Sequence, residues 1–593
     1  MTNKIYEDLS PIIRRSHKIF ILVQIVFVLL IFIFWKIQII DHKKYWELSE
    51  ANRLREISIP AQRGIITDRR GEILAKNIAS FKVSIIRENC EDLEKSCFRI
   101  AEILNLKPDV IKQRIDKFKT LPEFHPIIIK DNLTPAEVAM IESHKLELPE
   151  LLLQSEPKRN YPQGACASHI LGYVQELSLS EMKLEKYRDK KLGDLIGKTG
   201  IEKKYDARLA GRGGLLIEIV DSLGRSKEQI QDRPPQPGGK IELTLDFNIQ
   251  NKCEEMLDGK EGAIVVMDPR NGEVLAMTSY PDYDPNKFVN RFTPNEWLEL
   301  VNSTEYPLEN RATRGLYSPG STFKPAMLLA ALDSKTITKR TTFFCSGSVK
   351  IYGNDFYCWN RGGHGSVNIY ESIQKSCNIY FYQLGKMMKI EKISEYARKF
   401  GFGQRTGIDL PEEKAGIVPD PDWKKRTTNN PWYPGETISV SIGQGPLLVT
   451  PLQLAVYTSH IANRGMKKVR PYLLMDAFDS ESAAIDINAD IFEDVIEGMW
   501  RSVNRGGTAW AARVEGMEIC GKTGSTQVIS RETAEKLAKK NIVLKTHSWF
   551  IGFAPRKAPR IAIIVLVEFG GMGGSTAAPI AREIFKFCEH LQW

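Results

Sequence analysis

The pattern of apolar and polar positions changes most sharply near the start of the chain. Residues 19–40 are apolar except for Gln24, Lys36 and Gln38. At about 1.5 Å per residue this stretch is roughly 33 Å long as a helix, enough to cross a bilayer. A soluble core helix is rarely apolar on all sides, and no small-residue cleavage site follows. The pattern therefore predicts an uncleaved membrane anchor at residues 19–40, preceded by a short tail at residues 1–18.

Beyond the anchor, the spacing of apolar residues changes several times along the chain. Residues 41–56 are polar with helical spacing, as expected of a stalk, and alternating runs such as 56–59 and 81–86 predict strands. Between about 88 and 155 the spacing becomes helical. The proline- and glycine-rich residues 232–239 predict a linker. This first region should therefore mix strands with a helical segment and end near residue 240.

The remainder of the chain, residues 241–593, predicts one large α/β unit. Residues 262–268 and 561–567 are almost continuously apolar. Runs of this kind are typical of strands in a sheet that is covered on both faces. We therefore expect helices to pack against this sheet.

Composition and charge exclude several classes of protein. Hydrophobic residues make up 42% of the 593 residues and charged residues 26%, which excludes a mostly disordered chain and a polytopic membrane protein. The net charge of +9 is a mild basic bias, which suits an anionic membrane or polymer but also an ordinary solvated surface. No stretch resembles a nucleic-acid-binding module, so no nucleic acid is expected as a partner.

Candidate chemistry begins at Ser321. Pro319 and Gly320 break the chain before it, and an apolar helical pattern follows, so Ser321 should lie at a helix start with Lys324 on the same face. A helix N-terminus offers free N–H groups and a positive dipole to an oxyanion. A partly desolvated lysine can act as the base for a serine. The S-x-x-K string recurs elsewhere in the chain, so only this context distinguishes the copy at Ser321.

Two further short motifs follow in order. Residues 376–378 read Ser-Cys-Asn, and residues 522–526 read Lys-Thr-Gly-Ser-Thr, a cation and three hydroxyls on one extended segment. Residues 516–523 also match the P-loop pattern G-x-x-x-x-G-K-[ST]. A P-loop opens into a helix that holds phosphate, whereas the residues after Thr523 are rich in β-branched side chains. A strand, not a phosphate-binding loop, is therefore predicted here.

The ordered set S-x-x-K, S-x-N and K-T-G is far more specific than any one of its members. With it, the chain resembles the class B penicillin-binding proteins, particularly those of the elongation type. The resemblance extends over nearly the whole chain, through residues 63–71, 159–162 with 169–173, 200–206, 443–445 with 450–451, and 549–555. A second K-T-G at residues 198–200 falls within this resemblance as part of a pedestal.

The resemblance implies an α/β (α+β) multidomain fold. It consists of a cytoplasmic tail at residues 1–18, one transmembrane helix at 19–40, and an elongated, mostly β pedestal of the dimerisation type at 41–240. The pedestal carries the helical insertion at about 88–155. A serine transpeptidase domain at 241–593 would contain an antiparallel sheet flanked by helices.

The resemblance also implies acyl transfer on peptidoglycan stem peptides that end in D-Ala-D-Ala. Ser321 would attack the penultimate D-Ala carbonyl, D-Ala would leave, and an amine of a neighbouring stem would take the acyl group. Lys324 would be the base, and Ser376 would relay a proton to the leaving amine. β-Lactams would acylate Ser321 as substrate mimics. No cofactor would be required for catalysis.

Substrate-binding roles are implied for the remaining motif residues. Asn378 would hold a substrate amide and Lys522 would add positive potential. The terminal carboxylate would be bound in the segment of Thr523, Gly524, Ser525 and Thr526, with Thr523 and Ser525 gripping it. The backbone N–H groups of Ser321 and Ser525 would form an oxyanion hole, in which each donor contributes about 3 kcal/mol.

This chemistry takes place outside the cytoplasmic membrane, and so it fixes an orientation that the flanking charges leave open. The resemblance implies a single-pass protein of the bacterial cytoplasmic (inner) membrane with an extracytoplasmic, periplasmic catalytic domain. Expected partners are peptidoglycan stem peptides, β-lactams, the membrane, and a polytopic glycan polymerase of the elongation machinery. The elongation type is indicated by Gly363-His364-Gly365 and by the chain ending soon after the last predicted strand.

Three alternatives remain open from the sequence. The first is a division-type transpeptidase, the second is a D,D-carboxypeptidase or β-lactamase of the same fold, and the third is a catalytically idle β-lactam sensor or scaffold. The anchor and the long pedestal favour the transpeptidase, since simple hydrolases need neither. The intact serine and lysines argue against an idle scaffold.

Cys345, Cys358, His364 and Cys377 form a chemically reasonable zinc set of three thiols and one imidazole. Their spacing matches no short zinc finger. Some elongation-type relatives are similar in carrying zinc in this region on a mixed carboxylate, histidine and cysteine set. A Cys345–Cys358 disulfide or plain buried thiols are the alternatives, and Cys90 and Cys97 could also pair. A zinc ion here would be structural, with no open position for water.

Overall fold

The computed structural model describes residues 10–120, 123, 125–188, 190, 194–220, 226–290, 292–477, 483–527 and 546–591. The first nine residues of the predicted tail lie outside this range. The chain divides into two units. The first contains Met1–Gln62, Ala79–Pro157 and Gly211–Pro237, and the second contains Arg63–Ile78, Lys158–Ala210 and Gly238–Trp593.

The first unit begins with the long helix α1 (Ser10–Trp35), which continues as the π-helical turn η1 (Lys36–Ile40). Over Arg15–Ile40 this helix is long and apolar enough to cross a membrane, and none of its side chains is buried. The predicted stalk is helical only as far as Arg53, in α2 (His42–Arg53). The next residue, Leu54, already begins a strand, two residues before the predicted one.

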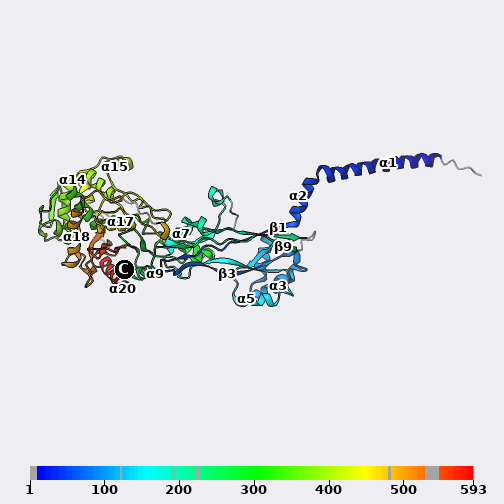
Figure 1. Ribbon diagram of the computed structural model, residues 1–593, viewed down its shortest axis with the longest axis horizontal. Coiled ribbons are helices and arrows are strands. Elements are labelled where there is room, and N and C mark those ends of the chain that lie inside the picture. Colours follow the sequence, from blue (N-terminus) through cyan, green and yellow to red (C-terminus); the bar gives the residue numbers. More distant parts are fainter. Residues whose placement is uncertain are drawn as a thin grey trace, which may run out of the picture. The chain divides into compact units, whose positions relative to one another are not determined.

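Two sheets follow in this unit. The strands β1 (Leu54–Ile59), β8 (Gly214–Val220) and β9 (Ser226–Arg233) form an antiparallel sheet in the order β1-β8-β9 (Figure 1). The end of β3 (Ile73–Ile85) pairs with β4 (Ile127–Lys130) and β5 (Leu151–Asn160). Since β9 continues to Arg233, the first two residues of the predicted linker belong to a strand.

The predicted helical segment at about 88–155 contains three helices, α3 (Leu93–Leu104), α4 (Pro108–Lys117) and α5 (Pro135–Ser143). Their apolar faces pack on β3 and β4 in one core. Pro135 occupies the first turn of α5, directly after the cap residue Thr134. The segment also contains β4 and the start of β5, which were not predicted because their short apolar runs do not distinguish strand from helix.

The first part of the second unit brings three distant motifs together on Glu202. Arg63 donates from Nε to Glu202 Oε2 at 2.5 Å, and Arg159 donates from Nε to Oε1 at 2.7 Å. The hydroxyl of Tyr161 also donates to Oε1, at 3.2 Å. All four side chains are buried, so each charge requires its partner. The second K-T-G, at residues 198–200, leads directly into the helix that carries Glu202. It is therefore part of the structure around this buried cluster.

The short elements around this cluster are β2 (Ile66–Thr67), α6 (Ser168–Leu171), β6 (Val174–Glu176), β7 (Leu195–Gly197), α7 (Gly200–Lys204), α8 (Asp206–Leu209) and β10 (Ile241–Glu242). Strand β10 pairs with β2 in parallel, and β2 pairs with the start of β3.

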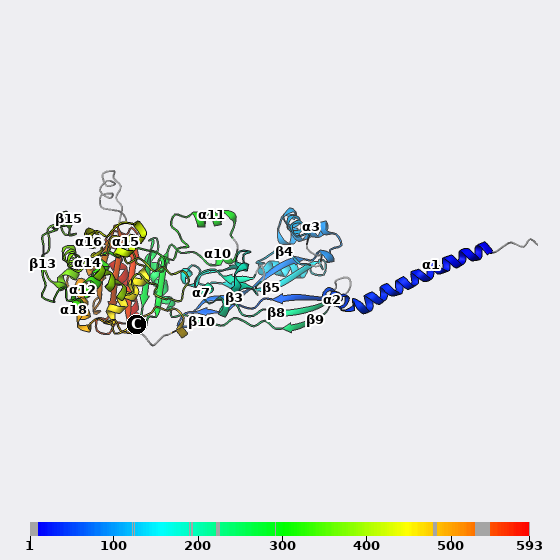
Figure 2. The same cartoon turned by 90° about the horizontal axis from the view of Figure 1, so that it is seen from above.

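A five-stranded antiparallel sheet forms the centre of the second unit (Figure 2). Its order is β12 (Val274–Tyr280), β11 (Gly262–Met267), β19 (Ile561–Val567), β18 (His547–Ala554) and β17 (Cys520–Thr526). Alternate side chains of β11 and β19 enter two different cores. Both predicted apolar runs are therefore strands buried on both faces.

Helices cover both faces of this sheet. On one face lie α9 (Phe247–Leu257) and α20 (Ala577–His590), and α17 (Pro451–Ala462) packs on the other. Further helices of the unit are α12 (Lys324–Asp333), α13 (Ile369–Gln374), α14 (Asn378–Lys399), α16 (Pro434–Val440) and α18 (Ala489–Asn504). Of these, α18 packs against β17 and α13, and α14 packs against α12 and α16. The unit also contains α10 (Asn286–Val289), α11 (Pro294–Asn302) and α15 (Pro421–Thr428).

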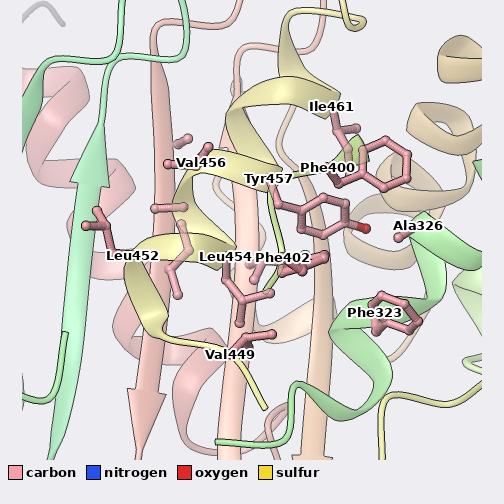
Figure 3. Packing of buried hydrophobic residues seen from close by; sticks show 14 of the residues in the cluster. Phe323, Ala326, Phe400, Phe402, Val449, Leu452, Leu454, Val456, Tyr457 and Ile461 are labelled. Carbon is pink, nitrogen blue, oxygen red and sulfur yellow. The ribbon is translucent and has the colours of Figure 1, made fainter. Parts of the chain in front are cut away.

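An aromatic cluster connects this core to the predicted nucleophile (Figure 3). Tyr457 of α17 packs against Phe400 and Phe402, with ring centroids 5.7 and 5.1 Å away, and Phe402 lies 5.8 Å from Phe323. Phe323 is buried and belongs to the short 3₁₀ helix η5 (Gly320–Phe323), which also contains Ser321. The turn that carries Ser321 is therefore anchored in the main core.

Candidate active site

Ser321 lies in η5, directly before α12, and its side chain is half-buried. The predicted helix start is thus a 3₁₀ turn, and the α-helix itself begins at Lys324. Gly320 has φ +55°, and a Cβ placed there would lie 2.4 Å from Cγ2 of Thr526. Only glycine fits such a contact, so the turn of Ser321 packs directly on the end of β17.

Two buried lysines share the hydroxyl of Ser376. Lys324 donates from Nζ to Ser376 Oγ at 3.2 Å, to the Ser376 carbonyl at 2.9 Å and to Asn378 Oδ1 at 2.7 Å. Lys522 donates from Nζ to Ser376 Oγ at 2.9 Å and to the carbonyl of Thr523 at 2.8 Å. Both lysines are fully buried. The structure therefore brings one member of each of the three motifs into direct contact.

Ser376 occupies the junction between α13 and α14. Its φ is +50°, in the left-handed region that residues with a Cβ rarely adopt. Asn378 is the first residue of α14. Besides accepting from Lys324, the Asn378 amide donates to the carbonyl of Tyr357 at 3.3 Å. The S-x-N motif thus forms a sharp turn in which the side chains of Ser376 and Asn378 are hydrogen-bonded to Lys324, Lys522 and the Tyr357 carbonyl.

Burial lowers the pKa values of both lysines. Removal from water lowers the pKa of Lys324 to about 8. For Lys522, burial and then the neighbouring Lys324 ammonium lower the pKa well below 10.5. Neither ammonium group has a carboxylate within ion-pair distance among the described residues. Lys324 can therefore exchange a proton near neutral pH.

The K-T-G segment is β17, a strand at one edge of the sheet. Positions 522, 524 and 526 share the face of the strand toward the turn of Ser321, and a Cβ on Gly524 would lie 3.0 Å from Cγ2 of Thr322. Thr523 donates from Oγ1 to Thr508 Oγ1 at 3.0 Å. Ser525 is exposed, and its Oγ accepts from the backbone N–H of Gly573 at 3.1 Å. An extended strand also rules out the P-loop.

Ser321 and Ser525, the predicted oxyanion-hole residues, belong to segments that pack against each other. A Cβ on Gly320 would lie 3.2 Å from the carbonyl oxygen of Ser525. No hydrogen bond of the Ser321 hydroxyl lies among the described contacts. In proteins without substrate, catalytic hydrogen bonds are often long.

Comparison with known proteins places this geometry in a family. A profile of the penicillin binding protein transpeptidase domain matches residues 262–586, and one of the penicillin-binding protein dimerisation domain matches residues 58–243. The chain is 34% identical to the peptidoglycan D,D-transpeptidase MrdA of Escherichia coli (strain K12) over 585 residues, covering 95% of this chain and 92% of the relative. The chain belongs to the class B penicillin-binding proteins.

Solved structures agree with this assignment. A penicillin-binding protein, PBP2, in complex with MreC from Helicobacter pylori has a TM-score of 0.80 and 31% identity, covering 90% of this chain and 99% of that one. A chain from work on structural coordination of polymerization and crosslinking by a peptidoglycan synthase complex has a TM-score of 0.72 and 28% identity, covering 96% and 97%. The predicted family, fold class and transpeptidase activity are therefore confirmed.

This penicillin-binding protein also gathers its predicted zinc set. Sγ of Cys345, Sγ of Cys358 and Sγ of Cys377 and a ring nitrogen of His364 all lie within 4.8 Å of one another. Nδ1 of His364 is 3.5 Å from the sulfurs of both Cys345 and Cys358. All nine cysteines are free thiols, including Cys90 and Cys97. Cys377 lies between Ser376 and Asn378, so this cluster adjoins the S-x-N motif.

Three of the four residues, Cys345, Cys358 and His364, belong to a small lobe of two hairpin-like strand pairs. Strand β13 (Phe343–Cys345) pairs with β16 (Gly365–Val367), and β14 (Ser348–Ile351) pairs with β15 (Asn354–Tyr357). We call residues 343–367 the thiol lobe.

Three contacts of the site in this penicillin-binding protein were not predicted. Thr508 holds Thr523, Gly573 holds Ser525, and the Tyr357 carbonyl holds Asn378. Each partner is at least 15 residues away in sequence, and two of the three contacts use a backbone group. The adjacent glycines at residues 506–507, just before Thr508, were the one local signal of a turn.

Proposed function

We propose that this D,D-transpeptidase crosslinks stem peptides during lateral cell-wall elongation with Ser321 as the nucleophile and Lys324, Ser376 and Lys522 around it. One observation carries the proposal: the Ser376 hydroxyl lies between Nζ of Lys324 and Nζ of Lys522, beside the turn of Ser321. A hydroxyl held between two amines of lowered pKa can pass a proton in either direction. This is what an acylation followed by a transfer to an amine requires.

In the first step, Ser321 Oγ attacks the penultimate D-Ala carbonyl while neutral Lys324 accepts the hydroxyl proton. The new C–O bond gives a tetrahedral oxyanion, which the backbone N–H groups of Ser321 and Ser525 stabilise. The C–N bond then breaks, and the proton moves through the Ser376 hydroxyl to the departing D-Ala amine. In the second step, the amine of a neighbouring stem attacks the acyl-serine, and the same groups return the proton to Ser321.

Binding of the donor stem uses the remaining residues. Lys522 supplies positive potential, and the terminal carboxylate binds along Thr523, Gly524, Ser525 and Thr526 on the edge strand. Among the described contacts, the Asn378 amide nitrogen uses one hydrogen on Tyr357, which leaves the other for a substrate carbonyl. A β-lactam presents the same carbonyl and carboxylate and acylates Ser321.

The apolar helix α1 supports a single-pass anchor in the bacterial cytoplasmic membrane, with the catalytic domain on the periplasmic side. We propose residues 1–18 as the cytoplasmic tail, 19–40 as the anchor, 41–240 as the pedestal and 241–593 as the transpeptidase domain. A polytopic glycan polymerase is the proposed partner, because one relative comes from a peptidoglycan synthase complex.

The transpeptidase reaction needs no cofactor, and we propose that the four-residue thiol cluster holds a structural zinc ion. Three sulfurs and one imidazole within 4.8 Å of one another match a tetrahedron with Zn–S bonds of about 2.3 Å. Bound zinc would crosslink the thiol lobe to the S-x-N turn through Cys345, Cys358, His364 and Cys377, with no open position for water.

Elemental analysis tests the metal. Full-length protein purified without chelator is expected to contain about one zinc per chain, and Cys345→Ser is expected to lose it, whereas Cys588→Ser, a buried thiol elsewhere, keeps it. Metal-free protein with three reactive thiols in this cluster would contradict the proposal.

A fluorescent penicillin tests the proposed function. Detergent-purified protein should carry the label on the Ser321 peptide, and Ser321→Ala should carry none. Incubation with a lipid-linked glycan polymer bearing stem peptides should then give crosslinked dimers. Release of D-Ala without crosslinks would instead indicate a hydrolase, and unlabelled, folded wild-type protein would overturn the catalytic role of Ser321.

A further inference from the structure

The thiol lobe presents an aromatic side chain that is both exposed and fixed. The indole of Trp359 is 58% exposed. Nevertheless, its Nε1 donates to the carbonyl of Lys375 at 2.9 Å, and its ring lies 5.4 Å from the ring of His364. An exposed aromatic ring that is already held in one orientation can pack against a ligand with little loss of side-chain entropy. Trp359 therefore offers a flat apolar face at little entropic cost on binding.

Trp359 lies next to the S-x-N motif of the proposed catalytic centre. Lys375, which accepts its indole N–H, directly precedes Ser376. Two residues before Trp359, the Tyr357 carbonyl accepts from the Asn378 amide. Residues 357–359 thus run alongside the S-x-N turn, bonded to it on both sides of Ser376. A molecule bound to Ser321 and Asn378 would extend past this segment.

A cation accompanies the aromatic face. Arg361 is exposed, and its guanidinium lies 4.2 Å from the ring centroid of Tyr357. In the part of the chain that the structure describes, no carboxylate pairs with Arg361. Stacking holds the planar guanidinium in place and leaves its N–H edge open, an arrangement suited to binding a carboxylate.

An aromatic face and a guanidinium fit different parts of one ligand. A tryptophan face packs against the C–H face of a saccharide ring, and an arginine pairs with a carboxylate. We propose that Trp359 and Arg361 form a subsite for the glycan-proximal part of the substrate. A saccharide ring stacks on Trp359, and a carboxylate of the attached stem peptide pairs with Arg361. The inference rests on the proposed function, since the peptidoglycan substrate supplies both groups.

Binding measurements can separate the two contacts. Calorimetry with full-length, detergent-solubilised Ser321→Ala protein avoids turnover, and the probes are a disaccharide-pentapeptide and the pentapeptide alone. Trp359→Ala should raise Kd for the disaccharide-pentapeptide about tenfold, and for the pentapeptide less than about twofold. Arg361→Gln should raise Kd for both probes. Tyr352→Ala, an exposed aromatic of the same lobe (53% exposed), is the matched control and should change neither.

Trp359→Phe keeps a ring but removes the bond to Lys375, so it distinguishes stacking from support of the turn. It should retain disaccharide-pentapeptide binding within about threefold. The saccharide contact is refuted if Trp359→Ala weakens both probes equally, or if it behaves like Tyr352→Ala. Failure of the proposed function would appear separately, as wild-type protein that penicillin does not acylate.

Discussion

At the level of a single residue, the backbone of Ser376 is strained. A φ of +50° costs a residue with a Cβ about 1–2 kcal/mol relative to the right-handed region. The turn keeps this conformation because Lys324 and Lys522 both donate to Ser376 Oγ. Strain of this kind is typical of residues that must present one group in one direction.

The lowered pKa of Lys324 predicts how acylation depends on pH. Lys324 must be neutral to accept a proton, and its pKa is about 8. Below that pH the protonated form dominates, so the rate of penicillin acylation should rise about tenfold from pH 6 to pH 7 and level off above about pH 9. Stopped-flow fluorescence with a fluorescent penicillin measures this profile.

Lys324→Arg is the control for this profile, because arginine stays protonated throughout the range. Its acylation should be at least about 100-fold slower and independent of pH. A wild-type rate that does not change between pH 6 and pH 9 would exclude Lys324 as the base.

Sequence reasoning named candidate residues that the structure brings together, but not their backbone conformations. The order of the three motifs named Ser321, Ser376 and Lys522. Nothing local indicates that Ser376 adopts a left-handed backbone, since serine is not favoured there. The same limit applies to Thr508 and Tyr357, which reach the site only through tertiary packing.

At the level of elements, the site depends on the contact between η5 and β17. Replacing Gly320 with alanine would place a Cβ 2.4 Å from Thr526 and force a left-handed backbone on a residue with a side chain. Gly320→Ala should therefore shift Ser321 away from the K-T-G strand and slow penicillin acylation at least about tenfold. Acylation rate and thermal unfolding should be measured on the same preparation.

Gly516→Ala is the matched control for Gly320→Ala. Gly516 also has a left-handed φ, of +81°, but a Cβ there meets nothing within 4 Å. This control reports the backbone strain alone, and its acylation rate should stay within about twofold of wild type. Equal losses in both variants would show that the η5–β17 contact does not matter.

Helices and strands with a long, regular apolar pattern were predictable from the sequence, and short ones were not. The continuous apolar runs of β11 and β19 were recognisable. Strand β4, with four residues, was not, because pairing with β3 decides its conformation. Likewise, Arg233 pairs with Leu215 of β8 and so extends β9 into the predicted linker, although its neighbours are typical of a linker.

At the level of the whole molecule, the apolar helix determines how the protein can be handled. None of the side chains from Arg15 to Ile40 is buried, so this surface must be covered by lipid or detergent. A chain that starts at residue 41 should remain in solution without detergent and acylate penicillin within about twofold of the full-length rate. Sedimentation and acylation assays measure this.

The control for this truncation is the full-length chain, which should enter the detergent phase. Loss of acylation in a folded, truncated protein would mean that the helix also supports the catalytic domain.

The two lysines buried around Ser376 have a consequence for folding. Burial lowers the pKa values of both lysines, and no carboxylate lies nearby among the described residues. At pH values where the unfolded chain holds these protons more tightly than the folded one, this burial lowers the free energy of unfolding. An anion that settles beside them balances this charge, and its binding energy adds to the stability of the domain. The catalytic domain is thus at its least heat-resistant when empty, and an inhibitor acts on it as a folding ligand.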